Sequence, residues 1–112
     1  AVNSDYSEKS PYMSVQENGT DFFLTAQKMR DYIELYQSEE KDKDNPYFAP
    51  IKAKTFANLP RTLILTAELD PLRDEGEDYG RKKMWTYRFI AYKMQFMDFL
   101  LWDLNIIMCR KV

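Results

Sequence analysis

The residue with the clearest chemical potential is Asp70, which stands between an apolar run and a charged stretch in "TLILTAELDPLRDEGEDYG", Thr62 to Gly80. A carboxylate just beyond a buried parallel strand lies at the sheet edge where α/β proteins gather ligand and catalytic groups. There it can hydrogen bond one ring nitrogen of a histidine, which fixes the tautomer and stabilises the imidazolium. From spacing alone a structural role is the favoured interpretation, because Asp is a good N-cap and Pro71 suits the first position of a helix.

Histidine is absent from the sequence. Most general acid–base and nucleophilic mechanisms near neutral pH use imidazole, because its pKa lies close to the working pH. The chain therefore cannot run a Ser-His-Asp or Cys-His mechanism with its own residues alone.

Size and composition narrow the remaining classes. The chain has 112 residues, 45% of them apolar and 30% charged, so it forms at most one small globular domain. Its net charge of −2 provides no field for nucleic acid, which we exclude as a partner. Cys109 is the only cysteine, so we expect no internal disulfide, no metal and no cofactor, and we predict a cytoplasmic location. The segment Ala1 to Ser14 is polar and does not resemble a signal peptide.

One helix is predicted after Thr25, whose hydroxyl suits an N-cap. Its apolar side chains recur at i, i+3, i+4 and i+7 and form one stripe, Met29, Tyr32, Ile33 and Tyr36. We expect this stripe to pack in a core or against another domain.

A strand and a second helix are predicted around Asp70. The segment Arg61 to Ala67 has consecutive apolar residues, which indicates a strand buried on both faces. The helix from Leu72 to Met84 has acids early and bases late, which matches the helix dipole. The glycines on its inner face, Gly76 and Gly80, indicate a close approach to a sheet, since glycine otherwise costs helix propensity.

The other segments are predicted to be irregular. Ala1 to Gly19 is polar and broken by proline, and Gln37 to Asp44 has the mixed charge of a solvated loop. Asn45 to Pro50, "NPYFAP", contains two prolines and is expected to be extended, with its aromatic pair as an anchor. Asn18-Gly19-Thr20 matches a glycosylation acceptor, but the turn chemistry of Asn-Gly is the favoured interpretation.

The segment "LPRTLILTAELDPLRDEGEDYG", Leu59 to Gly80, closely resembles the acid-bearing segment of the hormone-sensitive-lipase-like branch of the α/β-hydrolases. These proteins are carboxylesterases of the acetyl-esterase kind. In that family the Asp before Pro-Leu is the acid of the catalytic triad, and the resemblance assigns this role to Asp70. "NPYFAP" and the helix after Thr25 look like the segments that precede it. The resemblance implies a small acyl ester as the substrate of a complete enzyme.

Two parts of that family's machinery are missing. Its Gly-x-Ser-x-Gly nucleophile turn and its His-Gly-Gly-Gly-like oxyanion loop are absent, since the only glycines are Gly19, Gly76 and Gly80. We therefore expect residues 1–84 to be the C-terminal portion of an α/β-hydrolase domain, in a fragment that is inactive alone. The predicted fold class is α/β, an incomplete hydrolase fold with one buried strand flanked by helices and an apolar, helical tail. Uncovered strand edges and apolar surface predict self-association or aggregation.

Residues 85–112 do not match the family, which continues with a strand and a turn carrying the triad histidine. Three hypotheses fit this tail: an amphipathic membrane-surface helix, a helix or strand packed on the domain, and an out-of-frame translation. Its scattered charges leave no clean polar side and interrupt any membrane span, so a membrane is not expected as a partner.

The genetic code supports the out-of-frame hypothesis. Joining the last base of each codon to the first two of the next forces alanine at junction 94/95 and glycine at junctions 97/98 and 102/103. The shifted line can read Asp-Ala-Ile-His-Gly-Phe, which resembles the family's histidine turn. The nucleotide sequence around Lys82 decides this hypothesis.

The alternative to a piece of an enzyme is a non-enzymatic binding or interaction module. In it Asp70 only caps a helix, and the aromatic-rich tail meets a membrane or a partner protein.

Overall fold

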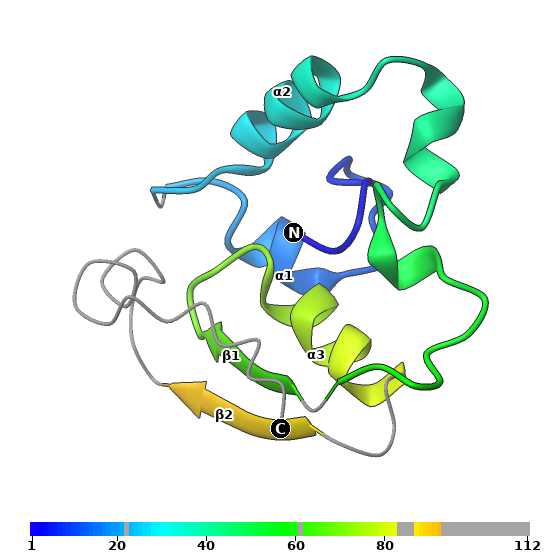
Figure 1. Ribbon diagram of the computed structural model, residues 1–112. Helices are drawn as coiled ribbons and strands as arrows, with labels where there is room; N and C mark the ends of the chain where they lie inside the picture. Colours follow the sequence, from blue (N-terminus) through cyan, green and yellow to red (C-terminus); the bar gives the residue numbers. More distant parts are fainter. Residues whose placement is uncertain (22, 61, 83–86, 93–112) are drawn as a thin grey trace.

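The computed structural model describes residues 1–21, 23–60, 62–82 and 87–92. Its regular elements are, in chain order, α1 (Met13–Glu17), α2 (Ala26–Tyr36), the 3₁₀ helices η1 (Glu40–Asp44) and η2 (Pro50–Lys52), β1 (Thr62–Ala67), α3 (Arg73–Lys82) and β2 (Tyr87–Tyr92). Figure 1 shows α3 packed against the two strands, with α1 and the N-terminal segment beyond α3.

The strands β1 and β2 pair in parallel, with Thr62 opposite Tyr87 and Ala67 opposite Tyr92. The helix α3 connects them, so the three elements form a β–α–β unit. This unit confirms the predicted α/β fold class and the predicted strand. Burial of β1 is greatest at its carboxyl end, where Thr66 and Ala67 are both buried.

The structure corrects one detail of the predicted fold, because residues 87–92 form a second strand where the sequence analysis expects a helical tail. The segment "YRFIAY" is rich in aromatic and β-branched residues, which favour strands. A partner also satisfies one edge of β1, which would otherwise expose unpaired backbone groups. Residues 93–112 lie outside the described residues, so the helical, membrane-binding and out-of-frame hypotheses stay predictions there.

The helix α2 begins where the sequence predicts. The Thr25 hydroxyl accepts a hydrogen bond from the Lys28 N–H at 3.2 Å and caps the helix. Only half of the apolar stripe is in the core, since Met29 is buried and Ile33 packs against the same cluster. The other half is exposed and consists of Tyr32 and Tyr36.

The two segments after α2 differ from their predictions. The charged run is not a loop throughout, because η1 forms over Glu40–Asp44 with a capping box between Glu39 and Asp42. The "NPYFAP" segment turns into η2 and is not extended. Of its aromatic pair, Tyr47 is 95% exposed, and Phe48 contacts the Tyr36 ring with the centroids 5.2 Å apart. Only Phe48 therefore acts as an anchor.

The prediction of a loop over Ala1 to Gly19 is wrong in part. This segment contains α1, and its Tyr6 and Val15 form the core cluster together with Met29 of α2. Polar residues of this segment, such as Ser14 and Asn18, are also buried, because they form hydrogen bonds with α3 and the turn before it. The polar composition of this segment therefore did not predict that it packs against the rest of the chain.

The helix α3 confirms the second predicted helix and its close approach to the sheet. A Cβ atom at Gly76 would lie 3.2 Å from the Thr66 Cγ2 atom, and Gly80 is buried. Acids stand in the first turn of α3 and bases in the last, which suits the helix dipole. Two ion pairs on this helix, Arg81–Glu77 and Lys82–Asp78, each join residues that are one turn apart.

Gly19 occupies the tightest backbone position among the described glycines. A Cβ atom there would lie 2.1 Å from the Val15 carbonyl oxygen. We expect Gly19→Ala to lower the free energy of unfolding by about 2–3 kcal/mol, because a backbone carbonyl cannot rotate away from the added methyl group. Urea unfolding followed by circular dichroism measures this. Thr20→Ala, at the exposed next residue, is the control and is expected to stay within about 0.5 kcal/mol of wild type; equal stability of the two variants would contradict the prediction.

Candidate functional site

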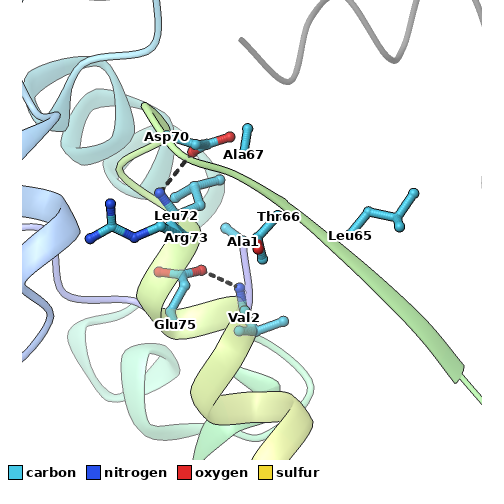
Figure 2. Close-up of a pocket in the computed structure, with 10 residues that line it drawn as sticks. Ala1, Val2, Leu65, Thr66, Ala67, Asp70, Leu72, Arg73 and Glu75 are labelled. Atoms are coloured by element: carbon cyan, nitrogen blue, oxygen red, sulfur yellow. Dashed lines mark hydrogen bonds between the residues drawn. The ribbon is translucent and has the colours of Figure 1, made fainter. Parts of the chain in front are cut away.

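Asp70 lies in the short turn that joins the carboxyl end of β1 to α3 (Figure 2). Its side chain is 9% exposed. One carboxylate oxygen, Oδ1, accepts a hydrogen bond from the Leu72 N–H at 2.8 Å, and the Asp70 carbonyl accepts one from the Arg73 N–H at 3.1 Å. Asp70 therefore caps the turn that leads into α3, in keeping with the structural interpretation. It also stands at the sheet edge that the catalytic interpretation requires.

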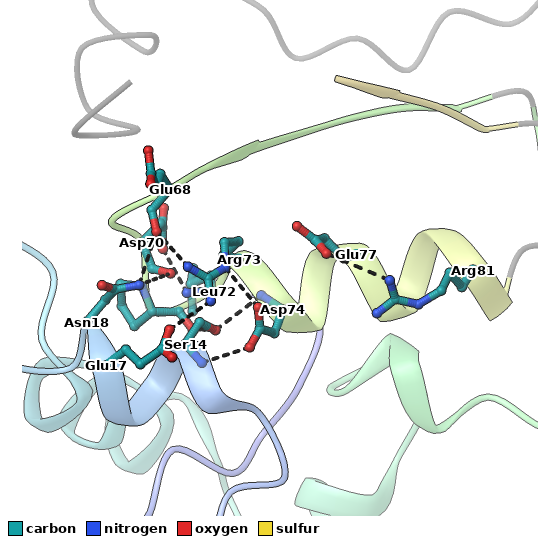
Figure 3. A network of polar contacts seen from close by, with 11 residues as sticks. Ser14, Glu17, Asn18, Glu68, Asp70, Leu72, Arg73, Asp74, Glu77 and Arg81 are labelled. Atoms are coloured by element: carbon teal, nitrogen blue, oxygen red, sulfur yellow. Dashed lines mark hydrogen bonds and ion pairs between the residues drawn. The ribbon is translucent and has the colours of Figure 1, made fainter. Parts of the chain in front are cut away.

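The turn is fastened to α1 through Ser14, which is fully buried. The Ser14 hydroxyl donates to the Pro71 carbonyl at 2.8 Å and accepts from the Asp74 N–H at 3.1 Å. The Ser14 N–H donates to the Asp74 carboxylate at 2.8 Å. These bonds, drawn in Figure 3, run in both directions between α1 and the start of α3. They satisfy backbone groups that a helix start leaves without partners.

Arg73 adds a positive charge to these contacts between α1 and the start of α3, which we call the junction. Its guanidinium bonds the Asp74 carboxylate, the Glu17 carboxylate of α1 and the Glu68 carbonyl, each at 2.9 Å. Burial alone raises the pKa of Asp74, but the hydrogen bonds from Arg73 and Ser14 outweigh it and lower that pKa. The pKa of Arg73 is raised, chiefly by its bond to Asp74. The junction therefore remains ionised near neutral pH.

The end of α1 also reaches the turn. The Asn18 side chain is 4% exposed, and its Nδ2 donates to the Glu68 carbonyl at 3.2 Å and to the Asp70 carbonyl at 3.4 Å. The amide nitrogen of the Asn18-Gly19-Thr20 motif is thus engaged in the fold. This supports the turn interpretation over the glycosylation one.

A second carboxylate, Glu75, is buried one turn further along α3 and is 1% exposed. Its Oε1 accepts hydrogen bonds from the Val2 N–H at 2.7 Å, the Asn3 N–H at 3.4 Å and the Tyr6 hydroxyl at 3.0 Å. Burial raises the pKa of Glu75, and these bonds oppose the rise. Burial beside Glu75 also raises the pKa of Tyr6. The sequence analysis assigns Glu75 only a dipole role, because an acid in a first helical turn carries no signal of burial.

A cavity of about 170 Å³ connects the two carboxylates. Asp70 and Glu75 line it together with apolar groups of Leu65, Ala67 and Leu72 (Figure 2). Among the described residues, no three His, Cys, Asp or Glu side chains are grouped to hold a metal ion. In the same part of the chain, no helix has the length and apolarity needed to cross a membrane.

Comparison with known proteins decides the family. Residues 2–88 match the model of the family described as the alpha/beta hydrolase fold. The chain belongs to the α/β-hydrolase family. The resemblance to its carboxylesterase-type branch is thereby confirmed, and the β–α–β unit with the Asp70 turn is a part of the α/β-hydrolase fold.

The relatives of this α/β-hydrolase chain include several esterases. It is 44% identical over 64 residues to an arylesterase of Saccharolobus solfataricus, covering 56% of this chain and 21% of that protein. It is 35% identical over 68 residues to an ethyl acetate hydrolase of Pseudomonas putida, covering 61% and 21%. A hyperthermophilic esterase from the archaeon Pyrobaculum calidifontis superposes with a TM-score of 0.71 at 37% identity, over 82% of this chain and 30% of that one. The chain thus spans about a fifth of the length of the curated relatives it matches.

The raised pKa of Glu75 makes stability depend on pH in a defined direction. Because the folded protein holds this proton more tightly than the unfolded chain, stability falls as pH rises from the ordinary value of 4.5 through the raised one. Glu75→Gln removes this titration. We therefore expect the variant to gain stability relative to wild type as pH rises above the ordinary value of 4.5.

Urea unfolding at stepped pH measures this difference. Glu8→Gln, at an exposed position in the N-terminal segment, is the control for loss of a carboxylate. A difference between Glu75→Gln and wild type that stays constant with pH would contradict the prediction.

Proposed function

We propose that the chain is the acid-bearing part of a carboxylic ester hydrolase, in which Asp70 is the acid of a Ser-His-Asp triad. The complete enzyme cleaves small acyl esters through an acyl-enzyme. Asp70 hydrogen bonds the imidazole that takes the proton of the serine, which fixes the tautomer and stabilises the imidazolium. The single observation that carries the proposal is the buried Asp70 carboxylate at the carboxyl end of β1 in a family of esterase relatives.

The division of the catalytic parts supports the same proposal. Residues 1–84 contribute the acid and its supporting turn, whereas the sequence has no histidine and no Gly-x-Ser-x-Gly turn. In the proposal, the nucleophilic serine, the imidazole and the oxyanion donors are therefore supplied by residues of the complete enzyme other than these. Out-of-frame translation over residues 85–112 would account for the missing histidine. By itself the chain lacks the groups that form and hydrolyse an acyl-enzyme.

The proposal is tested by grafting this chain into an esterase that supplies the other groups. In the arylesterase of Saccharolobus solfataricus, the aligned segment is replaced by the corresponding residues of this chain, and hydrolysis of 4-nitrophenyl acetate is followed. Asp70→Asn in the graft is expected to lower kcat about 10³- to 10⁴-fold, because the imidazole loses its orienting carboxylate. The chain alone is expected to give no turnover above buffer.

Glu68→Gln is the matched control, since it removes an exposed carboxylate from the same turn. It is expected to leave kcat within about twofold of the unaltered graft. Equal kcat values for Asp70→Asn and Glu68→Gln would overturn the assignment of Asp70.

We also infer that the isolated chain self-associates through an apolar surface on and around α2. Large side chains are exposed there, among them Leu35, Tyr36 and Tyr47. Large apolar side chains that are exposed close together favour association or aggregation. A hydrolase domain that is several times longer than this chain has further elements to cover such a surface.

Sedimentation velocity over a range of protein concentrations tests self-association. Leu35→Lys is expected to weaken it about tenfold or more, because it places a charge in the contact. Gln27→Lys adds the same charge at another exposed position of α2 and is the control. A concentration-independent monomer, or equal weakening by both variants, would contradict this inference.

A further inference from the structure

We propose that Asn18 is a positioning residue for the Asp70 carboxylate, which it directs by holding the backbone of the acid turn from α1. This inference rests on the proposed role of Asp70. Nothing in the sequence pattern assigns a task to Asn18 beyond a turn. The structure places its side chain where the turn after β1 has most need of hydrogen-bond donors.

The direction of the Asp70 carboxylate depends on the backbone of its turn. The Oδ1 atom is held by the Leu72 N–H of the same turn at 2.8 Å. Any rotation of the peptide groups on either side of Asp70 moves this N–H and the Cα–Cβ bond together. A group that fixes those peptides therefore also fixes where the carboxylate points.

Asn18 bonds two carbonyl groups of the turn with one nitrogen atom, and the second of them belongs to the peptide that follows Asp70. Its Nδ2 donates to the Glu68 carbonyl at 3.2 Å and to the Asp70 carbonyl at 3.4 Å. A primary amide carries two N–H donors, so it can donate a hydrogen bond to both carbonyls at the same time. Aspartate of the same shape only accepts when ionised, and serine offers a single donor.

Asn18 is itself held firmly. It is the C-cap of α1, and its backbone N–H donates to the Ser14 carbonyl at 2.9 Å. Its side chain is buried, and Gly19 behind it packs against the Val15 carbonyl. The amide therefore has one available direction and acts as a fixed support.

The other side chains that bond this turn duplicate the Asn18 contacts only in part. Arg73 also donates to the Glu68 carbonyl, and Ser14 donates to the Pro71 carbonyl. The Asn18 side chain, in contrast, donates to the carbonyl of Asp70 itself. Among these three side chains, Asn18 therefore acts on the acid residue most directly.

A triad acid has to meet its imidazole within a few tenths of an ångström, and a misplacement of about 1 Å can cost about 100-fold in rate. Loss of the Asn18 amide leaves Asp70 present but less well directed. The expected effect is a lower kcat at an unchanged KM, because substrate binding does not involve this turn in the proposal.

The first test uses the full chain and amide hydrogen exchange. Asn18→Ala is expected to speed exchange at the Leu72 N–H about tenfold relative to the Met29 N–H in α2, since the Asp70 cap is loosened. The ratio of the two rates is unaffected by a loss of stability that acts on both amides. Gln16→Ala is the matched control: it truncates an exposed side chain of α1 outside the core cluster of Val15 and Met29, and the ratio is expected not to change. An unchanged ratio in Asn18→Ala would overturn the positioning role.

The second test uses the esterase graft described above. Asn18→Ala is expected to lower kcat about tenfold with KM within about twofold of the unaltered graft. Gln16→Ala is expected to leave kcat unchanged. If Asp70→Asn lowers kcat and Asn18→Ala does not, the proposed function stands and the positioning role fails. If Asp70→Asn has no effect, the proposed function fails, while the exchange ratio still reports whether Asn18 holds the turn.

Discussion

The start of α3 concentrates polar groups that are buried or half-buried, and α1 and the N-terminal segment supply most of their hydrogen-bond partners. A buried carboxylate without donors would be costly by several kcal/mol. Glu75 avoids this in part, because the N–H groups of Val2 and Asn3 and the Tyr6 hydroxyl donate to its Oε1. Its Oε2 is buried without a hydrogen-bond partner among the described residues. The packing of the N-terminal segment against α3 is therefore a requirement of electrostatics as much as of the apolar core.

The same junction explains how one residue can satisfy two interpretations. A residue that caps the turn between β1 and α3 is held at the carboxyl edge of the sheet by its capping hydrogen bond. For Asp70 that contact is the hydrogen bond from the Leu72 N–H to Oδ1. Structural and catalytic roles of such a residue are therefore compatible, and a helix-starting aspartate in this family does not have to be one or the other.

Local signals predicted the parts of the fold that local forces determine. The hydroxyl of Thr25, the apolar run of β1 and the charge gradient of α3 each act within a few residues, and all three elements form where expected. The N-terminal segment was not predictable in this way. Its short helix has no side-chain cap, and its buried polar residues find their partners some sixty residues away.

The site was predictable only in its central residue. Asp70 stands out because Asp-Pro after an apolar run is a local pattern. Asn18, Ser14 and Glu75 do not stand out, because their roles exist only once α1 and the first residues have packed on α3. An acid in a first helical turn and an Asn-Gly turn both have common surface uses, and sequence alone favours those uses.

The hydrogen bond between Val2 and Glu75 joins residues 73 positions apart. During synthesis, Val2 is made before α3, and until α3 is made the Val2 N–H has no Glu75 carboxylate to bond. Closing a loop of this length has a large entropic cost before any contact offsets it. The segment around Val2 is therefore expected to order only after α3 has formed, although it is made before α3.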